Sequence, residues 1–221
     1  MSEYHHVDEV VIDAKVVLQI IKHADNDERS SPNCLDGYLT GFSDGGVTEL
    51  THSFRSLSNE NSTNDDEFFK MSSSYQDNML RRLREQNQDH ILVGFYRKVP
   101  NFNFMTKSDD LLNLLDFQLV NDKANTNGTV MLVYDHIRMS SGDFGLRAYR
   151  ISEKAMKMYA KTKLKVNKNV KNPFSVSFIQ EAGLACDEIL VEVPISIKSS
   201  YSAFKIFGPA PKFGHFWPFS K

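Results

Sequence analysis

Seven histidines are the side chains of this 221-residue chain that could most readily bind a metal ion or transfer a proton. A hydrolytic metal site needs at least three ligands from His, Cys, Asp or Glu, with one position left open for water. No two of these histidines have a His-x-His or His-x-x-x-His spacing. The sequence therefore predicts no metal site and no cofactor at His5, His6, His23, His52, His90, His136 or His215.

Other motifs that carry chemistry give the same indication. Cys34 and Cys186 are too few for a disulfide framework or a structural zinc cluster, and no nucleophile motif surrounds either, so we interpret both as buried structural residues. The chain has no phosphate-binding Walker loop and no Gly-x-Gly-x-x-Gly turn. Its residues alone favour a non-enzymatic domain.

Length and composition limit the class of protein. With 41% hydrophobic residues, a chain of this length can bury roughly 70% of its unfolded surface, which excludes a disordered protein. Its apolar runs, such as residues 130–134, are much shorter than the roughly 18 residues that span a bilayer. The charged start MSEYHHVDEV lacks the apolar segment of a signal peptide. We therefore expect a soluble cytoplasmic protein.

Charge is unevenly distributed, although the net charge is only −2. The first 50 residues contain ten acidic and three basic side chains, whereas residues 151–221 contain five acidic and eleven basic ones. The lysine-rich part of that region has one aromatic residue, Tyr159, and so lacks the stacking surface of a single-strand binder. We interpret it as a solvated helix end and loop. The alternative is weak RNA contact through Lys161, Lys163, Lys165 and Lys168.

Hydrophobic patterning predicts an α/β fold with a mixed β-sheet flanked by helices. We expect a strand that leads into a helix ending near His23, a helix over 65–86, a helix that begins at Ser108, and a short helix capped by Ser152. The helix after Ser108 should bury Leu111, Leu112, Leu115 and Leu119. Further strands are expected at 35–42, 47–54, 90–96, 129–135, 144–151, 173–179 and 189–197.

Turn residues organise these strands. Gly45 and Gly46 predict a hairpin between the strands at 35–42 and 47–54, and the turn at 140–143 predicts a second hairpin. Pro194 cannot donate to a ladder and should place the last strand at a sheet edge. We expect one domain over 10–200, with a polar loop at 55–66 and a Lys/Asn-rich loop at 160–172. A flexible N-terminus at 1–9 and an aromatic, proline-rich tail at 201–221 should flank it.

Three segments carry a resemblance that extends from about Val10 to Ser200. They are YQDNMLRRLREQNQDHILVGFY, GTVMLVYDHIRMSSGDFGLRAYRIS and EVPISIKSS. In this order they resemble the MPN (Mov34/PAD-1 N-terminal) family. The phrases LRAYR and EVPISIK are most similar to the branch of that family that occurs in eukaryotic translation initiation factor 3. The resemblance implies a cytidine-deaminase-like three-layer arrangement of a mixed sheet and helices.

The resemblance also implies where catalytic chemistry would be. Catalytic members hold zinc with a JAMM motif, His-x-His followed after seven residues by Ser-x-x-Asp, directly after the Gly-aromatic-Tyr strand. In this chain the two histidine positions hold Arg97 and Val99, the serine position holds Lys107, and Asp110 is the one remaining ligand type. The general-base glutamate falls near Cys34. We therefore expect a degenerate site without zinc or isopeptidase activity, because guanidinium and valine cannot bind zinc.

Members without the motif act as scaffold subunits that pair with a second MPN domain through the helix before this strand. The resemblance thus implies a non-catalytic scaffold subunit of initiation factor 3. Its partners would be the other subunits, especially the MPN subunit designated f, and the small ribosomal subunit through the complex. The alternatives are a scaffold of the proteasome lid or the COP9 signalosome, and a JAMM zinc isopeptidase. Candidate interface residues are Met71, Tyr75, Met79 and Arg82.

Overall fold

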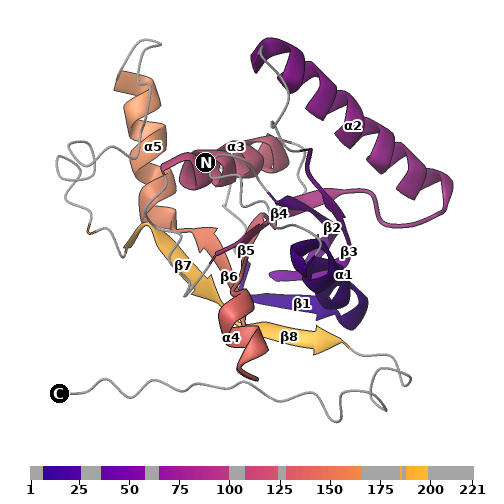
Figure 1. Ribbon diagram of the computed structural model, residues 1–221. Helices are drawn as coiled ribbons and strands as arrows, with labels where there is room; N and C mark the ends of the chain where they lie inside the picture. The colour runs from indigo at the N-terminus through magenta and orange to yellow at the C-terminus, as the bar shows by residue number, and fades with distance from the viewer. Residues whose placement is uncertain are drawn as a thin grey trace, which may run out of the picture.

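The computed structural model describes residues 7–25, 36–57, 65–99, 108–123, 128–165, 185 and 188–198. An eight-stranded mixed sheet, in the order β7-β6-β5-β4-β2-β3-β1-β8, organises these residues (Figure 1). Its strands are β1 (Glu9–Asp13), β2 (Gly37–Asp44), β3 (Val47–Arg55), β4 (Leu92–Lys98), β5 (Val130–Tyr134), β6 (Leu146–Ile151), β7 (Leu190–Val193) and β8 (Ile195–Lys198). The helices are α1 (Ala14–Asp25), α2 (Asp65–Glu85), α3 (Ser108–Lys123), α4 (His136–Ser140) and α5 (Glu153–Lys165).

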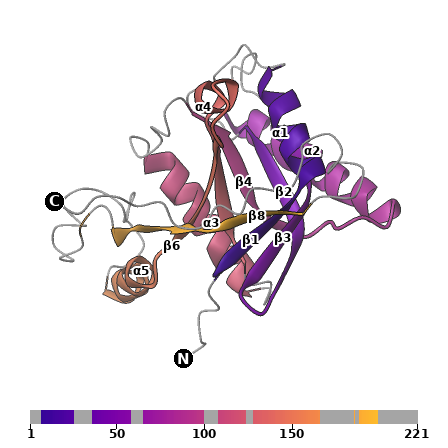
Figure 2. The same cartoon turned by 90° about the horizontal axis from the view of Figure 1, so that it is seen from below.

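Two hydrophobic cores lie on opposite faces of the sheet. Val16, Ile20 and Ala24 of α1 pack on one face, which we call the inner face, with Val10, Ile12 and Leu50 among the strand residues there. On the other, outer face, residues of α3 and α5 pack on β4, β5 and β6. Figure 2 shows α1 and α5 on opposite sides of the sheet. This helix–sheet–helix arrangement confirms the predicted α/β class, a mixed sheet flanked by helices.

The first predicted hairpin is present. β2 and β3 pair antiparallel, from Gly37 opposite Arg55 to Asp44 opposite Val47. Gly45 and Gly46 turn the chain with φ values of 55° and 86°, which residues with a side chain rarely adopt. One register shift, between Thr40 and Gly41, interrupts the ladder. The hairpin thereby sets which side chains of β2 and β3 point to the outer face.

The final two strands close the sheet. β7 pairs antiparallel with β6, and β8 pairs parallel with β1, so the strands at the two ends of the sheet are separated by Pro194 alone. Pro194 lacks an N–H, and its carbonyl accepts from Val10 N at 2.9 Å. Figure 2 shows β7 and β8 as one nearly continuous gold ribbon. The prediction that Pro194 marks an edge is confirmed, although it is one segment that supplies both edges.

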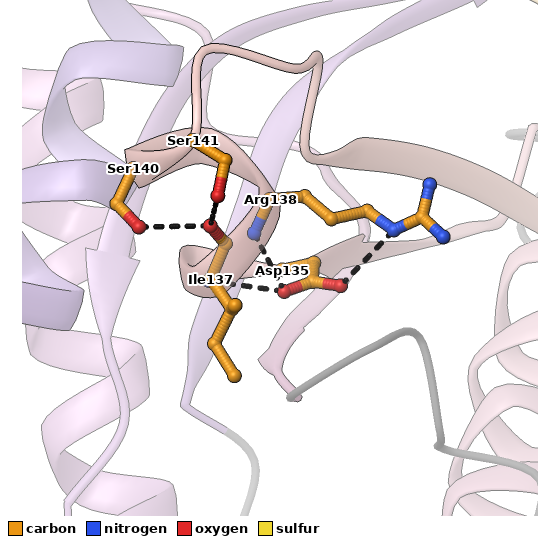
Figure 3. Close-up of polar contacts among 5 residues, drawn as sticks. All are labelled: Asp135, Ile137, Arg138, Ser140 and Ser141. Carbon is orange, nitrogen blue, oxygen red and sulfur yellow. Dashed lines mark hydrogen bonds and ion pairs between the residues drawn. The ribbon is translucent and has the colours of Figure 1, made fainter.

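The second predicted hairpin is correct in pairing and wrong in its connection. β5 and β6 are antiparallel, but the short helix α4 joins them instead of a tight turn. Asp135 starts this helix, because its Oδ1 accepts from the backbone N–H groups of Ile137 and Arg138 (Figure 3). Ser140 and Ser141 hydroxyls both donate to the Ile137 carbonyl. Five residues are too few to give a helical period in the sequence.

Several predicted boundaries need correction. The N-terminus expected to be flexible over 1–9 is fixed from Val7, which is 3% exposed, and Asp8 N donates to the Gly46 carbonyl. The first part of the Lys/Asn-rich loop expected over 160–172 is helical, since α5 continues to Lys165, and residues 166–172 lie outside the described residues. Ser152 caps α5 as expected, accepting from Ala155 N at 3.1 Å.

Two more predictions need correction: the bounds of the polar loop before α2, and the choice of buried leucines in α3. The polar loop expected over 55–66 overlaps α2, which starts at Asp65. In α3, Leu114 and Leu115 are the deeply buried leucines, whereas Leu111, Leu112 and Leu119 are half-buried. The strand predicted at 173–179, both cysteines and the tail at 201–221 lie outside the described residues. In the part of the chain that the structure describes, no helix is long and apolar enough to cross a membrane.

Candidate functional site

An arginine occupies the centre of the position where the sequence predicts a degenerate zinc site. Arg97, near the end of β4, and Asp110, in the first turn of α3, are both buried, with 5% and 2% of their surfaces exposed. Arg97 Nη1 donates to Asp110 Oδ1 at 2.8 Å. A charge-assisted bond of this kind is among the stronger polar contacts in proteins. The pair links the end of β4, an interior strand of the sheet, to the first turn of α3.

A second carboxylate completes the arrangement. Asp36, directly before β2, has its Oδ2 atom 3.9 Å from Arg97 Nε. The same oxygen accepts a hydrogen bond from the backbone N–H of Lys98. Lys98 Nζ in turn donates to the Ala24 carbonyl at the end of α1, at 2.8 Å. Charged side chains therefore join the end of β4 to β2, α1 and α3.

These residues do not fit a zinc ion. Neither Arg97 nor Val99 has a metal-binding atom, and Val99 packs in the outer core beside Leu114 and Leu115. Asp110 is the remaining ligand type, and the Arg97 guanidinium already supplies positive charge at its carboxylate. No group of three or more potential ligands occurs among the described residues. Lys107, at the serine position of the motif, lies outside the described residues.

Two side chains on neighbouring elements, His23 and Tyr134, have shifted pKa values. His23 Nδ1 lies 2.7 Å from the hydroxyl of buried Tyr96. Burial lowers the pKa of His23 below its ordinary value of 6.5, and the cations Arg55 and Lys22 lower it further. Burial also raises the pKa of Tyr134, at the end of β5, with Asp25 and Asp135 adding to the effect. Both shifts favour the neutral forms of the two side chains at neutral pH.

Sequence reasoning missed Asp36. The resemblance placed the lost general base near Cys34, which lies outside the described residues, but the carboxylate that approaches Arg97 belongs to the residue two positions later. No local signal could have identified it, because Asp36 and Arg97 are far apart in sequence and meet through the antiparallel pairing of β2 with β4. Side chains that pair across strands leave no periodic pattern in the sequence.

A nucleophile-like spacing near the hairpin has a structural explanation. Gly41, Ser43 and Gly45 have the Gly-x-Ser-x-Gly spacing of a nucleophile elbow. An elbow needs a strand-to-helix turn, whereas these residues end β2 and enter the turn to β3. Thr48 Oγ1 donates to Ser43 Oγ at 3.2 Å. These residues therefore form part of the β2–β3 hairpin, and Ser43 does not occupy the strand-to-helix turn of a nucleophile elbow.

The candidate interface residues lie on α2, which extends away from the sheet (Figure 1). None of the α2 side chains that the structure describes is buried. Met71 is 52% exposed and Arg82 is exposed, whereas Met79 is half-buried. The half-buried Tyr75 packs edge-on against Phe54 of β3, with ring centroids 6.5 Å apart. Tyr75 thus anchors α2 to the domain, while Met71 and Arg82 remain accessible.

The structure describes only part of the lysine-rich stretch that is the alternative RNA-binding surface. Lys161, Lys163 and Lys165 belong to the second half of α5, so they follow one another along a helix. Their side chains and the whole of Lys168 lie outside the described residues. The nearer lysines of α5 make ion pairs: Lys154 with Glu188, and Lys157 with Glu153. This part of α5 is a solvated, salt-bridged surface.

Comparison with known proteins assigns the fold to a family. A family model described as JAB1/Mov34/MPN/PAD-1 ubiquitin protease matches residues 5–118. Proteins named as the H subunit of eukaryotic translation initiation factor 3 are similar along most of the chain. The one from Nematostella vectensis is 31% identical over 88% of this chain and 52% of its own length. Those from Xenopus laevis and Aspergillus fumigatus are 34% and 32% identical over 88% and 87% of this chain, and 52% and 51% of their own lengths.

The family match covers the same part of the fold as the Arg97–Asp110 pair. This chain spans about half the length of the curated relatives it matches. The family match covers the elements from β1 into α3, including the strand of Arg97 and the helix of Asp110. The mixed sheet with a helical layer on each face is the architecture that the resemblance implied. The chain belongs to the JAB1/Mov34/MPN/PAD-1 family.

Proposed function

We propose that this chain is a non-catalytic MPN subunit of eukaryotic translation initiation factor 3, which acts as a scaffold in the cytoplasm. The names of its relatives support the assignment to translation initiation. The replacement of the metal ligands by Arg97 and Val99 supports the absence of catalysis. The single observation that carries the non-catalytic part of the proposal is the buried Arg97–Asp110 pair, since a guanidinium in this position opposes a divalent cation.

Zinc content tests the non-catalytic part of the proposal. We expect freshly purified protein to contain no zinc above the buffer level by inductively coupled plasma mass spectrometry. The double variant Arg97→His/Val99→His, in which two imidazoles stand beside Asp110, is the matched control for a restored ligand set. One zinc ion per wild-type chain, or cleavage of an isopeptide-linked ubiquitin chain, would contradict the proposal.

Pairing with a second MPN subunit is proposed to use α2. Its described side chains are all at least partly exposed, and the helix combines methionines with arginines, as interfaces often do. Met71, Met79 and Arg82 would contact the partner, and Tyr75 would hold α2 against Phe54 while doing so. By resemblance the partner is the MPN subunit designated f in the same complex.

A substitution on α2 tests this pairing. We expect Met79→Asp to abolish copurification with that partner, because it places a carboxylate in an apolar contact. Ser73→Asp, an exposed position on another side of the same helix, is the control and should leave pairing intact. If Met79→Asp and Ser73→Asp both retain the partner, α2 is not the interface.

Assembly into the complex is tested by affinity purification of the tagged chain from its own cells, followed by mass spectrometry. The scaffold proposal expects other initiation factor 3 subunits together with proteins of the small ribosomal subunit. Recovery of proteasome lid or COP9 signalosome subunits instead would assign the chain to a different MPN complex. Because the chain spans half of its relatives, this experiment should also include a full-length relative as a positive control.

A further inference from the structure

A lysine and a histidine lie in direct contact where α1 begins. Lys15 Nζ, from the first turn of α1, lies 2.6 Å from Nε2 of His52, in β3. A lysine ammonium has protons to donate and no lone pair to accept with, so His52 Nε2 must be the acceptor in this contact. His52 is then a neutral ring that carries its proton on Nδ1. The contact therefore requires one protonation state of the imidazole.

The neutral ring continues a chain of hydrogen bonds into the sheet. His52 Nδ1 lies 3.3 Å from Thr51 Oγ1, to which its proton is donated. The Thr51 hydroxyl in turn donates to the Thr40 carbonyl, at 3.5 Å. Thr51 is the residue that the register shift of the β2–β3 ladder leaves without a cross-strand partner. Each group donates to the next, so the start of α1 is tied to the irregular part of this ladder as long as His52 is neutral.

Groups that favour the protonated ring also face His52. Asp13, at the end of β1, accepts from the backbone N–H of Lys15 at 2.9 Å and supplies negative charge near the imidazole. Asp89, in the turn after α2, supplies further negative charge, and the side chain of Gln88 in the same turn adds a hydrogen bond. His52 therefore lies between an ammonium that suits its neutral form and carboxylates that suit its protonated form.

The turn that carries Gln88 and Asp89 is hydrogen-bonded to the end of α2. Asn87 has a φ of 53°, the left-handed conformation that commonly follows the last residue of a helix. Gln88 N donates to the Leu83 carbonyl at 2.9 Å, and Asn87 N donates to the Arg84 carbonyl at 3.0 Å. A change in the contact between His52 and this turn therefore acts on the end of α2.

Burial lowers the pKa of His52 below its ordinary value of 6.5, and the Lys15 ammonium lowers it further, whereas Gln88, Asp89 and Asp13 act in the opposite direction. The ring is consequently neutral at pH 7. When the pH falls far enough for the ring to bind a proton from solvent at Nε2, two positively charged donors face each other, and the contact with Lys15 is lost.

We propose that His52 is a pH-sensitive latch, which ties the first turn of α1 to β3 through Lys15 when neutral and pairs with the Asp89 carboxylate when protonated. Acidification thereby exchanges a link to α1 for a link to the turn after α2. The helix α2 is the one proposed above to bind a partner. An effect of the latch on pairing rests on that proposed function, whereas the latch itself does not.

Nuclear magnetic resonance of the intact 221-residue chain, with labelled histidine and lysine, tests the exchange of partners. His52→Gln identifies the ring signals by their loss. We expect Overhauser contacts between the His52 ring and the Lys15 side chain at pH 7.5, and their loss at pH 5.5. The titration midpoint of the ring should rise in Lys15→Met and fall in Asp89→Asn. His90→Gln, which removes an exposed histidine of the same turn, is the control and should leave the midpoint unchanged.

Amide hydrogen exchange of the chain without a partner tests the link to the end of α2. After correction for the intrinsic rate at each pH, exchange in residues 86–91 should be several-fold slower at pH 5.5 than at pH 7.5. This difference should disappear in His52→Gln and in Asp89→Asn, and it should persist in His90→Gln. A ring that keeps its Lys15 contact at pH 5.5, or a turn equally protected at both pH values, would overturn the latch. Neither result depends on partner binding, which Met79→Asp tests separately.

Discussion

Arg97 supplies positive charge at the buried end of β4, where the resemblance implies a zinc ion in catalytic relatives. In the structure its guanidinium lies against Asp110, with Asp36 close to its other side. The guanidinium therefore places a positive charge between a buried and a half-buried carboxylate. Arginine suits this role because it stays protonated at all ordinary pH values and offers several donors in a fixed plane. The guanidinium of Arg97 therefore opposes a divalent cation at this position and stabilises the Asp110 carboxylate.

Removing the guanidinium should reveal this contribution. We expect Arg97→Met to lower the free energy of unfolding by about 3–5 kcal/mol, because the buried Asp110 carboxylate loses its charge-assisted hydrogen bond to the guanidinium. Urea denaturation measures the change. Arg81→Met is the control, since Arg81 pairs with Glu85 on the exposed surface of α2 and should change stability little.

The double variant Arg97→Met/Asp110→Leu separates the two possible origins of such a loss. It removes both charges, so it should be less destabilised than Arg97→Met alone. If the single and double variants were equally unstable, the loss would come from packing around β4, and the electrostatic interpretation would be wrong.

His23 should make stability depend on pH. Its pKa is lowered in the folded protein, first by burial and then by Arg55 and Lys22, whereas the unfolded chain keeps the ordinary value of 6.5. The unfolded state therefore binds a proton first as the pH falls below about 7, and the folded state loses stability. We expect His23→Gln, which keeps a hydrogen-bonding group near Tyr96, to lose less stability than the wild type between pH 7.5 and 5.5.

Urea unfolding of both proteins at the two pH values measures this difference. His52, whose pKa is lowered mainly by burial and then by Lys15, contributes in the same direction and remains present in both proteins. An identical loss of stability in wild type and variant would mean that His23 titrates normally in the folded state.

At the scale of elements, the sequence predicted what depends on local signals. The β2–β3 hairpin followed from Gly45 and Gly46, and α2 followed from its apolar spacing and acidic start. It could not predict α4, whose signal is a single capping carboxylate, Asp135. Nor could it reveal that one segment supplies two edge strands, because strand order depends on contacts between distant residues.

The attachment of α2 is a second property that only the structure reveals. Tyr75 contacts Phe54, Phe54 contacts Tyr38, and Tyr38 contacts Phe117 of α3, so a row of rings joins α2 to the outer core. The sequence showed Tyr75 as part of an apolar stripe but could not separate anchoring from partner binding. Of the candidate site, it predicted Arg97, Val99 and Asp110 by their positions and missed Asp36, for which it offered no signal.

Loss of this anchor should loosen α2 and leave the sheet intact. We expect Tyr75→Ala to increase the rate of amide hydrogen exchange in α2, with exchange in β4 and β5 unchanged, because the ring contact with Phe54 disappears. Met71→Ala is the control on the same helix, since Met71 is largely exposed. Equal exchange in α2 for all three proteins would show that other contacts hold the helix.

At the scale of the whole molecule, closure of the sheet depends on residues 190–198. β7 completes the ladder beside β6, and β8 completes the ladder beside β1, at opposite ends of the strand order. Ile189, Leu190 and Val193 also fill the two cores, one group on each face of the sheet. This short segment therefore joins the two ends of the sheet and both of its hydrophobic layers.

Two truncations test this dependence. A chain that ends at Lys198 should unfold cooperatively in urea, followed by circular dichroism, because it retains all of the strands that the structure describes. A chain that ends at Ile189 should lose cooperative unfolding, since it loses β7 and β8 together and exposes β6 and β1 as edges. Cooperative unfolding of the shorter chain would show that the six remaining strands form a stable domain alone.

The position of this closing segment has a consequence during protein synthesis. β1 is made first, but the strand that covers it, β8, is made last, so the domain cannot be completed until residue 198 has left the ribosome. At about 5–20 residues per second, the growing chain exposes β1 for roughly 10–40 s. During that interval its unpaired edge is available to chaperones and to neighbouring nascent chains. The domain would thus itself need protection while the ribosome makes it.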